Sequence, residues 1–280
     1  MPELAYLNGE ILPIEKACIP IEDRGYQFGD AVYEFIASYN GKLFCLEQHL
    51  DRLERSMQGL SLPKIPREDI RAAVMTLFEK AGIARAGIYM QISRGVSPRN
   101  HPFPESAKPQ FVMTIRPVEE KPPELRQTGA TAITVEDYRW GRCDLKTVQL
   151  LPNVLAKQKA QEAEAFDAIF VSPEGVVREG TSSNVFVVAG GRLMTHPLTP
   201  QILPGITRAV VIELGRSIDL PVEERFFNVD DLLSAEEAFF TGTVTEVLPI
   251  VTVDRKHIGE GRVGSITSCL YDALRQQAGA

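Results

Sequence analysis

The sequence has few of the residues that mark metal sites and disulfide-rich folds. Its 280 residues include four cysteines, Cys18, Cys45, Cys143 and Cys269, which lie far apart and form no C-x-x-C pair. Such spacing is typical of reduced thiols, and it indicates neither a disulfide framework nor a zinc site. The four histidines are equally scattered and lack the spacing of a metal-binding motif. We therefore expect no metal centre.

Long apolar runs and an excess of positive charge are also missing. No apolar stretch approaches the ~18 residues of a membrane-spanning helix. The first ten residues lack the basic flank and apolar core of a signal peptide. The net charge of −7 argues against a general affinity for nucleic acid or acidic membrane surfaces, which need basic patches. A few local groups could still hold a small anion, and we expect the protein to be cytoplasmic.

Turn signals and apolar periodicity indicate a mixture of strands and helices. Asn8-Gly9 and Asn40-Gly41 each separate two apolar-rich runs, which is the strongest short-range signal for a β-hairpin. Apolar residues spaced by three and four predict helices over 46–60 and 67–83. Further expected elements are strands within 86–95, 109–118, 129–140 and 237–253, a meander over 167–196, and helices over 153–165, 206–218 and 265–277.

The stretch 119–129 is expected to separate two domains. It is charged and contains prolines, as is typical of a linker. A chain of 280 residues also favours about two domains. The mixture of hairpins and helices predicts an α+β fold, with an N-terminal domain over 1–118 and a C-terminal domain over 130–280.

One lysine lies in surroundings that are unusual for a charged side chain. In WGRCDLKTVQLLPN, residues 140–153, Lys146 belongs to a segment with the composition of a buried one. A lysine is almost never fully buried unless it is paired or has a chemical role. A lysine that forms a Schiff base must present a neutral amine, which a desolvated site favours. The simpler alternative is that Lys146 extends its charged tip to water.

Two further stretches could bind a pyridinium nitrogen and an anion. In VVREGTSSNVFVV, Glu179 precedes a polar cluster. The cluster comprises Thr181, Ser182, Ser183 and Asn184. It is either a solvated turn or the neighbourhood of a carboxylate that pairs with a pyridinium. In LPGITRAVV, the N–H groups of Ile206 and Thr207 at a helix start suit a phosphate, and Arg52 could bind the same anion. An ordinary helix cap and a surface arginine are the alternatives.

Six stretches occur in a characteristic order and at compatible spacing along nearly the whole chain. They are EDRGYQFGDAVYE, HLDRL, SRGVSPRNH, RWGRCDLKTVQLLPNVLAKQKA, REGTSSNVF and LPGITR. Together they resemble the motifs of the fold-type IV aminotransferases, which depend on pyridoxal 5′-phosphate (PLP). This family includes branched-chain aminotransferases, D-amino acid aminotransferases and aminodeoxychorismate lyases. The resemblance implies a homodimer of two-domain subunits, with PLP in the cleft between the domains.

The resemblance also assigns roles to particular residues. Lys146 matches the lysine that links to PLP as a Schiff base and then shuttles a proton between the substrate α-carbon and cofactor C4′. Glu179 matches the carboxylate at the pyridine nitrogen. The phosphate-binding set is matched by Arg52, Ile206, Thr207 and Thr243. The polar loop beside the cofactor is matched by Ser182, Ser183 and Asn184. Where the family often has a hydroxyl residue this chain has Gly242, so a backbone N–H alone can serve there.

The stretch SRGVSPRNHPF distinguishes between branches of the family. Arg99 and His101 alternate with Asn100, so on an extended segment both side chains point the same way and could trap a carboxylate. In an unrelated protein, a solvated loop with chance basic residues would be the better interpretation. With Tyr33 as third member, the arrangement resembles the carboxylate trap of D-amino acid aminotransferases. The resemblance implies transamination of the type D-alanine plus 2-oxoglutarate to pyruvate plus D-glutamate.

Other functions stay open at this point. Within the same fold, the alternatives are a branched-chain L-amino acid aminotransferase and an aminodeoxychorismate lyase. From another class, the alternative is a binding or scaffold protein without catalysis. A panel of D- and L-amino acids separates a D-amino acid aminotransferase from a branched-chain L-amino acid aminotransferase. A scaffold protein would be colourless when purified, whereas a PLP enzyme would be yellow.

Overall fold

The computed structural model describes residues 3–280, which divide into two compact units. Unit 1 comprises the chain up to Glu119 together with Leu145–Gln149, and unit 2 comprises Glu120–Asp144 and Leu150–Ala280. The boundary falls at the start of the expected linker. The expected C-terminal domain differs in one segment, because residues 145–149 belong to unit 1. They run beside the first unit's sheet, where Val32 and Thr147 form an antiparallel bridge.

Unit 1 is built on a six-stranded sheet of order β2-β1-β6-β5-β3-β4. Its strands are β1 (Leu4–Leu7), β2 (Glu10–Pro13), β3 (Ala31–Tyr39), β4 (Lys42–Leu43), β5 (Ala86–Ser93) and β6 (Gln110–Pro117). Both Asn-Gly hairpins are confirmed, with Leu7 paired to Glu10 and Tyr39 paired to Lys42. Asn8 and Asn40 have φ angles of 51° and 45°, the positive values that these tight turns need.

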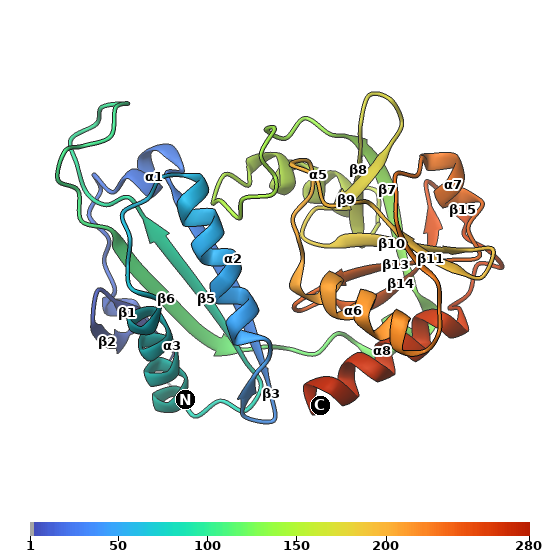
Figure 1. Ribbon diagram of the computed structural model, residues 1–280, viewed down its shortest axis with the longest axis horizontal. Helices are drawn as coiled ribbons and strands as arrows, with labels where there is room; N and C mark the ends of the chain where they lie inside the picture. The colour runs from blue at the N-terminus through green and yellow to red at the C-terminus, as the bar shows by residue number, and fades with distance from the viewer. Residues whose placement is uncertain (1–2) are drawn as a thin grey trace. The chain divides into compact units, whose positions relative to one another are not determined.

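Helices cover the sheet of unit 1, as Figure 1 shows. They are η1 (Ile14–Lys16), α1 (Arg24–Phe28), α2 (Leu46–Gly59) and α3 (Arg67–Ala81). The predicted apolar stripe of α2 packs into the core, where Leu50 and Leu53 are almost fully buried among side chains of β3, β5 and α3. Burying a leucine stabilises a fold by about 1.5–3 kcal/mol. The same packing fixes the polar side of α2 near β3.

Unit 2 contains a nine-stranded sheet and five helices among the described residues. Its strands are β7 (Ala130–Glu136), β8 (Asp167–Val171), β9 (Val177–Gly180), β10 (Asn184–Ala189), β11 (Arg192–Thr195), β12 (Val222–Glu224), β13 (Glu237–Gly242), β14 (Glu246–Val253) and β15 (Lys256–His257). Its helices are α4 (Pro123–Thr128), α5 (Leu151–Glu162), α6 (Ile206–Ser217), α7 (Val229–Leu233) and α8 (Ser265–Ala278).

The sheet of unit 2 closes on itself. Its order is β12-β11-β10-β13-β14-β7-β8-β9, and β9 pairs again with β10. The closing pair is Glu179 with Asn184. Closure therefore brings together two residues that the sequence singles out.

The predicted linker also contributes to unit 2. Residues 123–128 form helix α4, with a proline in its first turn. Arg126 of α4 donates to Val247 O over 2.9 Å and to the carboxylate of Glu246 over 2.6 Å. The stretch is thus a short helix attached to β14, although its charges and prolines suggest an open linker. Within residues 3–280, no helix combines the length and apolar character needed to cross a membrane.

Candidate functional site

Lys146 is held by the sheet and by a helix of unit 1. Tyr33 N donates to Lys146 O over 2.9 Å, and Lys146 N donates to Ser56 Oγ over 3.1 Å. Its side chain is half-buried, and Nζ lies 4.1 Å from the centre of the Tyr33 ring. The lysine is therefore fixed by β3 and α2 at its backbone and lies over an aromatic face at its amine. A freely solvated surface lysine would make none of these contacts.

A buried ionic cluster lies next to Lys146 on the same two elements. Glu34 of β3 is fully buried and accepts from Arg52 Nε over 2.6 Å and from Arg52 Nη2 over 2.8 Å. His49 Nδ1 lies 2.7 Å from Glu34 Oε2. Burial by itself raises the pKa of Glu34, but Arg52 and His49 hold that pKa well below its usual range. A carboxylate only accepts, so Nδ1 carries the proton of His49.

The same cluster keeps His49 neutral. Burial lowers the pKa of His49, and the charges of Arg52 and Lys146 lower it further, while Glu34 opposes them. Arg52, predicted to bind phosphate, is thus a buried guanidinium that Glu34 orients through two parallel hydrogen bonds. Its phosphate-binding role stays a prediction.

The predicted carboxylate trap is divided between two places in unit 1. Arg99 and His101 lie in bends, so the extended segment expected for them is absent from the described loop. Both side chains nevertheless meet at Phe28, with Arg99 Cζ 4.4 Å from the ring centre and the His101 ring 5.5 Å from it. Tyr33 contacts Lys146 and the ring of Tyr89 instead. No hydrogen bond or ring contact in residues 3–280 joins Tyr33 to Arg99 or His101.

In unit 2, Glu179 is a buried carboxylate with three donors. It accepts from Arg139 Nη1, from Asn184 Nδ2 over 3.0 Å and from Leu203 N over 2.9 Å. Burial raises the pKa of Glu179, and the guanidinium of Arg139 and the Leu203 N–H oppose that rise. At Glu179 the polar stretch is therefore buried and is not a solvated turn.

Arg139 connects Glu179 to a second carboxylate. Its Nε and Nη2 donate to the two oxygens of Asp137 over 2.9 Å and 2.8 Å, and its Cζ lies 4.2 Å from the centre of the Phe170 ring. Arg178 donates to Asp137 over 2.7 Å. Sequence reasoning left Arg139 without a role, although its i, i+2 spacing from Asp137 after a strand was a usable signal. Arg139 and Asp137 together determine which charges surround Glu179.

At the start of helix α6, a glycine leaves the backbone without a side chain that would cover it. Gly205 precedes the helix, and no side chain caps it. A Cβ at Gly205 would lie 2.1 Å from Asn184 Oδ1, so any larger residue there must displace the Asn184 side chain. Because the first N–H groups of a helix have no intrahelical acceptor, those of Ile206 and Thr207 are available to an anion. Asn184 also donates to Leu203 O over 2.9 Å, so one amide links Glu179 with this helix start.

The polar loop after β9 is tied to a buried aspartate. Asp167 of β8 accepts from Thr181 Oγ1 over 2.5 Å and from Ser183 Oγ over 3.2 Å. Ser183 is buried, whereas Ser182 is exposed. Asp167 therefore fixes the ends of the loop and leaves Ser182 at its tip.

Gly242 and Thr243 lie where β13 ends beside the start of β10. Asn184 pairs with Thr241 in the sheet, and Gly242 follows directly. A Cβ at Gly242 would meet Ser182 O at 3.3 Å. Thr243 begins the turn that leads to β14. The unit 2 residues that the sequence singles out therefore gather around one end of β9, β10 and β13 and the start of α6.

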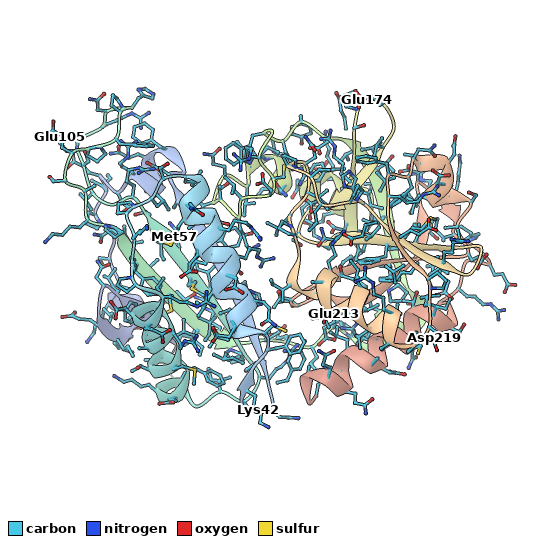
Figure 2. All side chains as sticks on the ribbon, viewed as in Figure 1. Lys42, Met57, Glu105, Glu174, Glu213 and Asp219 are labelled. Carbon is cyan, nitrogen blue, oxygen red and sulfur yellow. The ribbon has the colours of Figure 1, made fainter. Side chains whose placement is uncertain are left out.

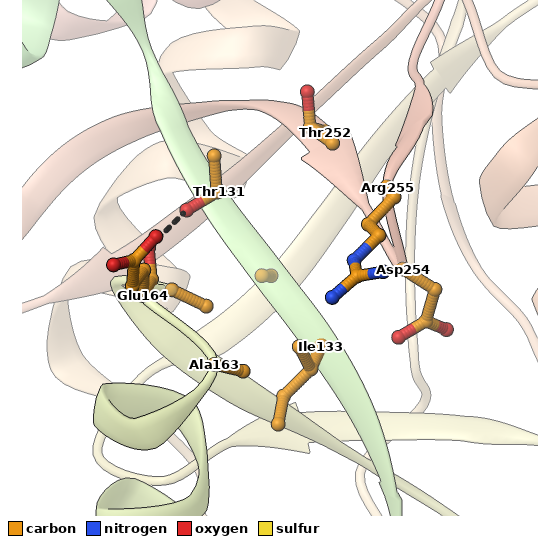
Figure 3. A pocket seen from close by; sticks show the side chains of 9 residues that line it. Thr131, Ile133, Ala163, Glu164, Thr252, Asp254 and Arg255 are labelled. Atoms are coloured by element: carbon orange, nitrogen blue, oxygen red, sulfur yellow. Dashed lines mark hydrogen bonds between the residues drawn. The ribbon is translucent and has the colours of Figure 1, made fainter.

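A pocket elsewhere in unit 2 contains none of the predicted residues (Figure 3). It is lined by Thr131, Ala132, Ile133, Ala163, Glu164, Ala165, Thr252, Asp254 and Arg255. Two of its polar side chains are engaged within the fold: Thr131 Oγ1 donates to Glu164 O over 3.4 Å, and Asp254 accepts from Thr134 N and Oγ1. In residues 3–280, no group of three or more His, Cys, Asp or Glu side chains could hold a metal ion.

Comparison with known families identifies the family of this chain. The family model of the class IV amino-transferases matches residues 31–253, which is most of the chain. The chain belongs to the class IV aminotransferases. Within this family, the D-alanine aminotransferase of Bacillus licheniformis is 41% identical over 269 residues, covering 96% of this chain and 94% of that protein. The D-alanine aminotransferase of Staphylococcus haemolyticus is 39% identical over 272 residues, covering 97% and 96%.

Solved structures of class IV aminotransferases have the same fold. The branched-chain amino acid aminotransferase of Escherichia coli is 25% identical, with a TM-score of 0.88 over 98% of this chain and 93% of that chain. The branched-chain aminotransferase of Thermoproteus uzoniensis with norvaline is 27% identical, with a TM-score of 0.89 over 99% and 95%. The predicted α+β, fold-type IV architecture is confirmed.

Proposed function

We propose that this enzyme transfers the amino group of D-amino acids to 2-oxo acids with PLP as cofactor. D-alanine plus 2-oxoglutarate, giving pyruvate plus D-glutamate, is the proposed reaction type. The observation that carries the proposal is that relatives named D-alanine aminotransferase are 37% to 41% identical to this chain over 95% to 98% of its length. A cytoplasmic homodimer with PLP between the domains is part of the same proposal.

The residues of unit 2 fit the polar groups of PLP. The uncapped start of α6 offers N–H groups and the positive end of a helix dipole for the phosphate. Glu179, buried and charge-compensated by Arg139, suits a protonated pyridine nitrogen. When bound, PLP supplies an electron sink for the charge that develops at the substrate α-carbon. Glu179 sustains that sink by keeping the ring nitrogen protonated.

Lys146 is the proposed general base and acid. Its amine takes the proton from the substrate α-carbon and returns it at cofactor C4′. In such a shuttle the amine must be held in a fixed position, and proton transfer is most efficient when the pKa of the catalytic group is close to the working pH. The backbone contacts to Tyr33 and Ser56 fix the segment that carries this amine.

Arg99 and His101 are the proposed ligands of the substrate α-carboxylate, together with Tyr33. Arg99 forms no ion pair within residues 3–280, and its side chain contacts Gln27 O and the Phe28 ring. Its charge is therefore left for a substrate, and a guanidinium matches a carboxylate in shape and charge. Holding the carboxylate at this pair would present the α-hydrogen of the D-enantiomer to Lys146.

A branched-chain L-amino acid aminotransferase is the second candidate. It is supported by the high TM-scores against branched-chain enzymes, whose identities to this chain lie between 24% and 27%. Initial rates with D-alanine and with L-leucine, with 2-oxoglutarate as acceptor, decide between the two. We expect D-alanine to react faster, and a strict preference for L-leucine would overturn the assignment. An aminodeoxychorismate lyase would instead release pyruvate from aminodeoxychorismate without any amino acceptor.

The cofactor assignment is tested by labelling Lys146. Borohydride reduction of the yellow protein should bleach it and leave a stable pyridoxyl group, which peptide mapping should locate on Lys146. The Lys146→Ala variant should lose the label and essentially all turnover, since no other group replaces the amine. Lys159→Ala, at an exposed position of α5, is the matched control and should keep both. A label on another side chain would refute the assignment.

A further inference from the structure

Arg99 and His101 lie in the loop between β5 and β6, and their own side chains make few contacts that could hold this loop in place. Both residues are exposed, and Figure 2 labels Glu105 farther along the same loop. Long surface loops are mobile unless their backbone groups are held by the rest of the fold. The position of the two side chains therefore depends on what holds the backbone between residues 95 and 109.

The buried side chain of Arg24 holds this backbone. Its side chain is 4% exposed, and it donates from Nη1 to Asn100 O over 2.5 Å and from Nη2 to His101 O over 3.1 Å. Nη1 also lies 3.5 Å from Pro102 O. Its Cζ lies 4.7 Å from the centre of the Phe28 ring, the ring on which Arg99 and His101 also rest. One buried guanidinium thus contacts the peptide groups on both sides of His101.

Asp30 orients Arg24 through an ion pair. Its Oδ2 accepts from Arg24 Nε over 2.9 Å and from Arg94 Nε over 2.7 Å. Arg94 is equally buried but donates to the carbonyls of Leu60 and Ser61. The two arginines therefore share one carboxylate. Arg24 holds the backbone on both sides of His101, whereas Arg94 reaches the same loop farther along, with its Cζ 3.5 Å from the centre of the Phe103 ring.

We propose that Arg24 is a positioning residue for substrate recognition, because it fixes the loop that carries the carboxylate-binding pair Arg99 and His101. This inference rests on the proposed function. Directions of side chains follow from their peptide planes, and Arg24 fixes the planes after residues 100 and 101.

The test compares two arginine-to-lysine substitutions in the holoenzyme. In Arg24→Lys the charge beside Asp30 is retained, but a single ammonium cannot span Asp30 and the two carbonyls. We expect the KM values for D-alanine and for 2-oxoglutarate both to rise at least about tenfold, while kcat changes less, because the hydrogen bonds from a charged group to the loop are lost. The matched control is Arg85→Lys. Arg85 donates to Ser38 O over 2.9 Å and lies over the Tyr39 ring, at the end of β5 opposite to the loop. Arg85→Lys should lower the unfolding temperature similarly without this rise in KM.

Two further measurements separate positioning from general stability. Hydrogen exchange of the amides of residues 96–104 should be faster in Arg24→Lys than in Arg85→Lys. In an Arg99→Ala, His101→Ala background, Arg24→Lys should raise KM no further, because both residues through which it acts are gone. Equal KM in Arg24→Lys and the wild type, or an equal rise in Arg85→Lys, would overturn this inference alone. A wild-type enzyme without D-amino acid transamination would instead overturn the proposed function.

Discussion

A carboxylate as deeply buried as Glu179 needs a fixed positive neighbour to stay ionised. Arg139 provides it, and Asp137 keeps Arg139 in place through two hydrogen bonds. Replacing Arg139 by methionine removes the charge that opposes the raised pKa of Glu179. We expect the pKa of Glu179 to rise further, and kcat with D-alanine to fall about 10- to 100-fold, the usual size of such supporting contacts. Steady-state kinetics measure this loss.

The control for Arg139 is Arg142, three residues further on. Arg142 forms the same kind of fork with Asp144, over 2.9 Å and 3.0 Å, but it is exposed. Arg142→Met should leave kcat within about a factor of two, since exposed ion pairs contribute little. The absorption band of the bound cofactor should change in Arg139→Met and stay unchanged in Arg142→Met. Equal kinetics and spectra for the two variants would contradict a role for Arg139.

At the level of single residues, the sequence singles out the chemical groups but not the residues that support them. Lys146 is noticeable because it lies in a segment with the composition of a buried one. Glu179 is noticeable because it directly precedes a dense polar cluster. Glu34 is a similar contradiction, a carboxylate inside the apolar run of β3, and could have been noticed. Arg139 is harder to assign, because its partner Glu179 is 40 residues away. The local spacing of Asp137 and Arg139 indicates that these two pair with each other, but it contains no information about Glu179.

At the level of elements, the start of α6 gives a sharp test of phosphate binding. Gly205 has an ordinary φ of −65°, so alanine there is not strained by its backbone. Its Cβ would, however, lie 2.1 Å from Asn184 Oδ1. Gly205→Ala should therefore displace Asn184 and the first turn of α6, at a cost of about 1–3 kcal/mol for overpacking. We expect PLP to bind about tenfold or more weakly, as measured by titrating apoenzyme and following absorbance.

Gly141→Ala is the matched control for Gly205→Ala. A Cβ at Gly141 meets nothing within 4 Å, so the same chemical change should leave PLP affinity unaltered. Were Gly205→Ala to bind PLP as tightly as Gly141→Ala, the start of α6 would not be part of the cofactor site.

Elements with a local signal were predicted well, and those made by distant pairing were not. Both hairpins and helices α2, α3, α6 and α8 follow from turn residues and apolar spacing, because their hydrogen bonds lie within a few residues. The segment 145–149 joins unit 1 through bonds to β3, more than a hundred residues earlier. The closure of β9 on β10 depends on the whole strand order of unit 2. Neither pairing leaves a periodic trace in the sequence.

At the scale of the whole molecule, the chain passes from unit 1 to unit 2, returns for residues 145–149 and leaves again. Unit 1 therefore needs a segment synthesised after the start of unit 2. That segment carries Lys146, beside the buried cluster of Glu34, His49 and Arg52. The stability of the fold and the environment of the proposed catalytic amine thus depend on the same charges.

This dependence predicts how stability changes with pH. His49 has a lowered pKa in the folded state because of burial and the charges of Arg52 and Lys146, while the unfolded chain takes up a proton near pH 6.5. The contribution of His49 is full above that pH and is lost as pH falls towards the lowered pKa. From pH 7.5 to 5.5, the free energy of unfolding should fall by up to about 1.4 kcal/mol more in the wild type than in His49→Asn. Asparagine can still donate to Glu34, and the other titrating groups are common to both proteins, so the difference between their urea unfolding curves isolates His49. Parallel pH dependences would mean that His49 has the same pKa in the folded and the unfolded protein, and would contradict the lowered pKa.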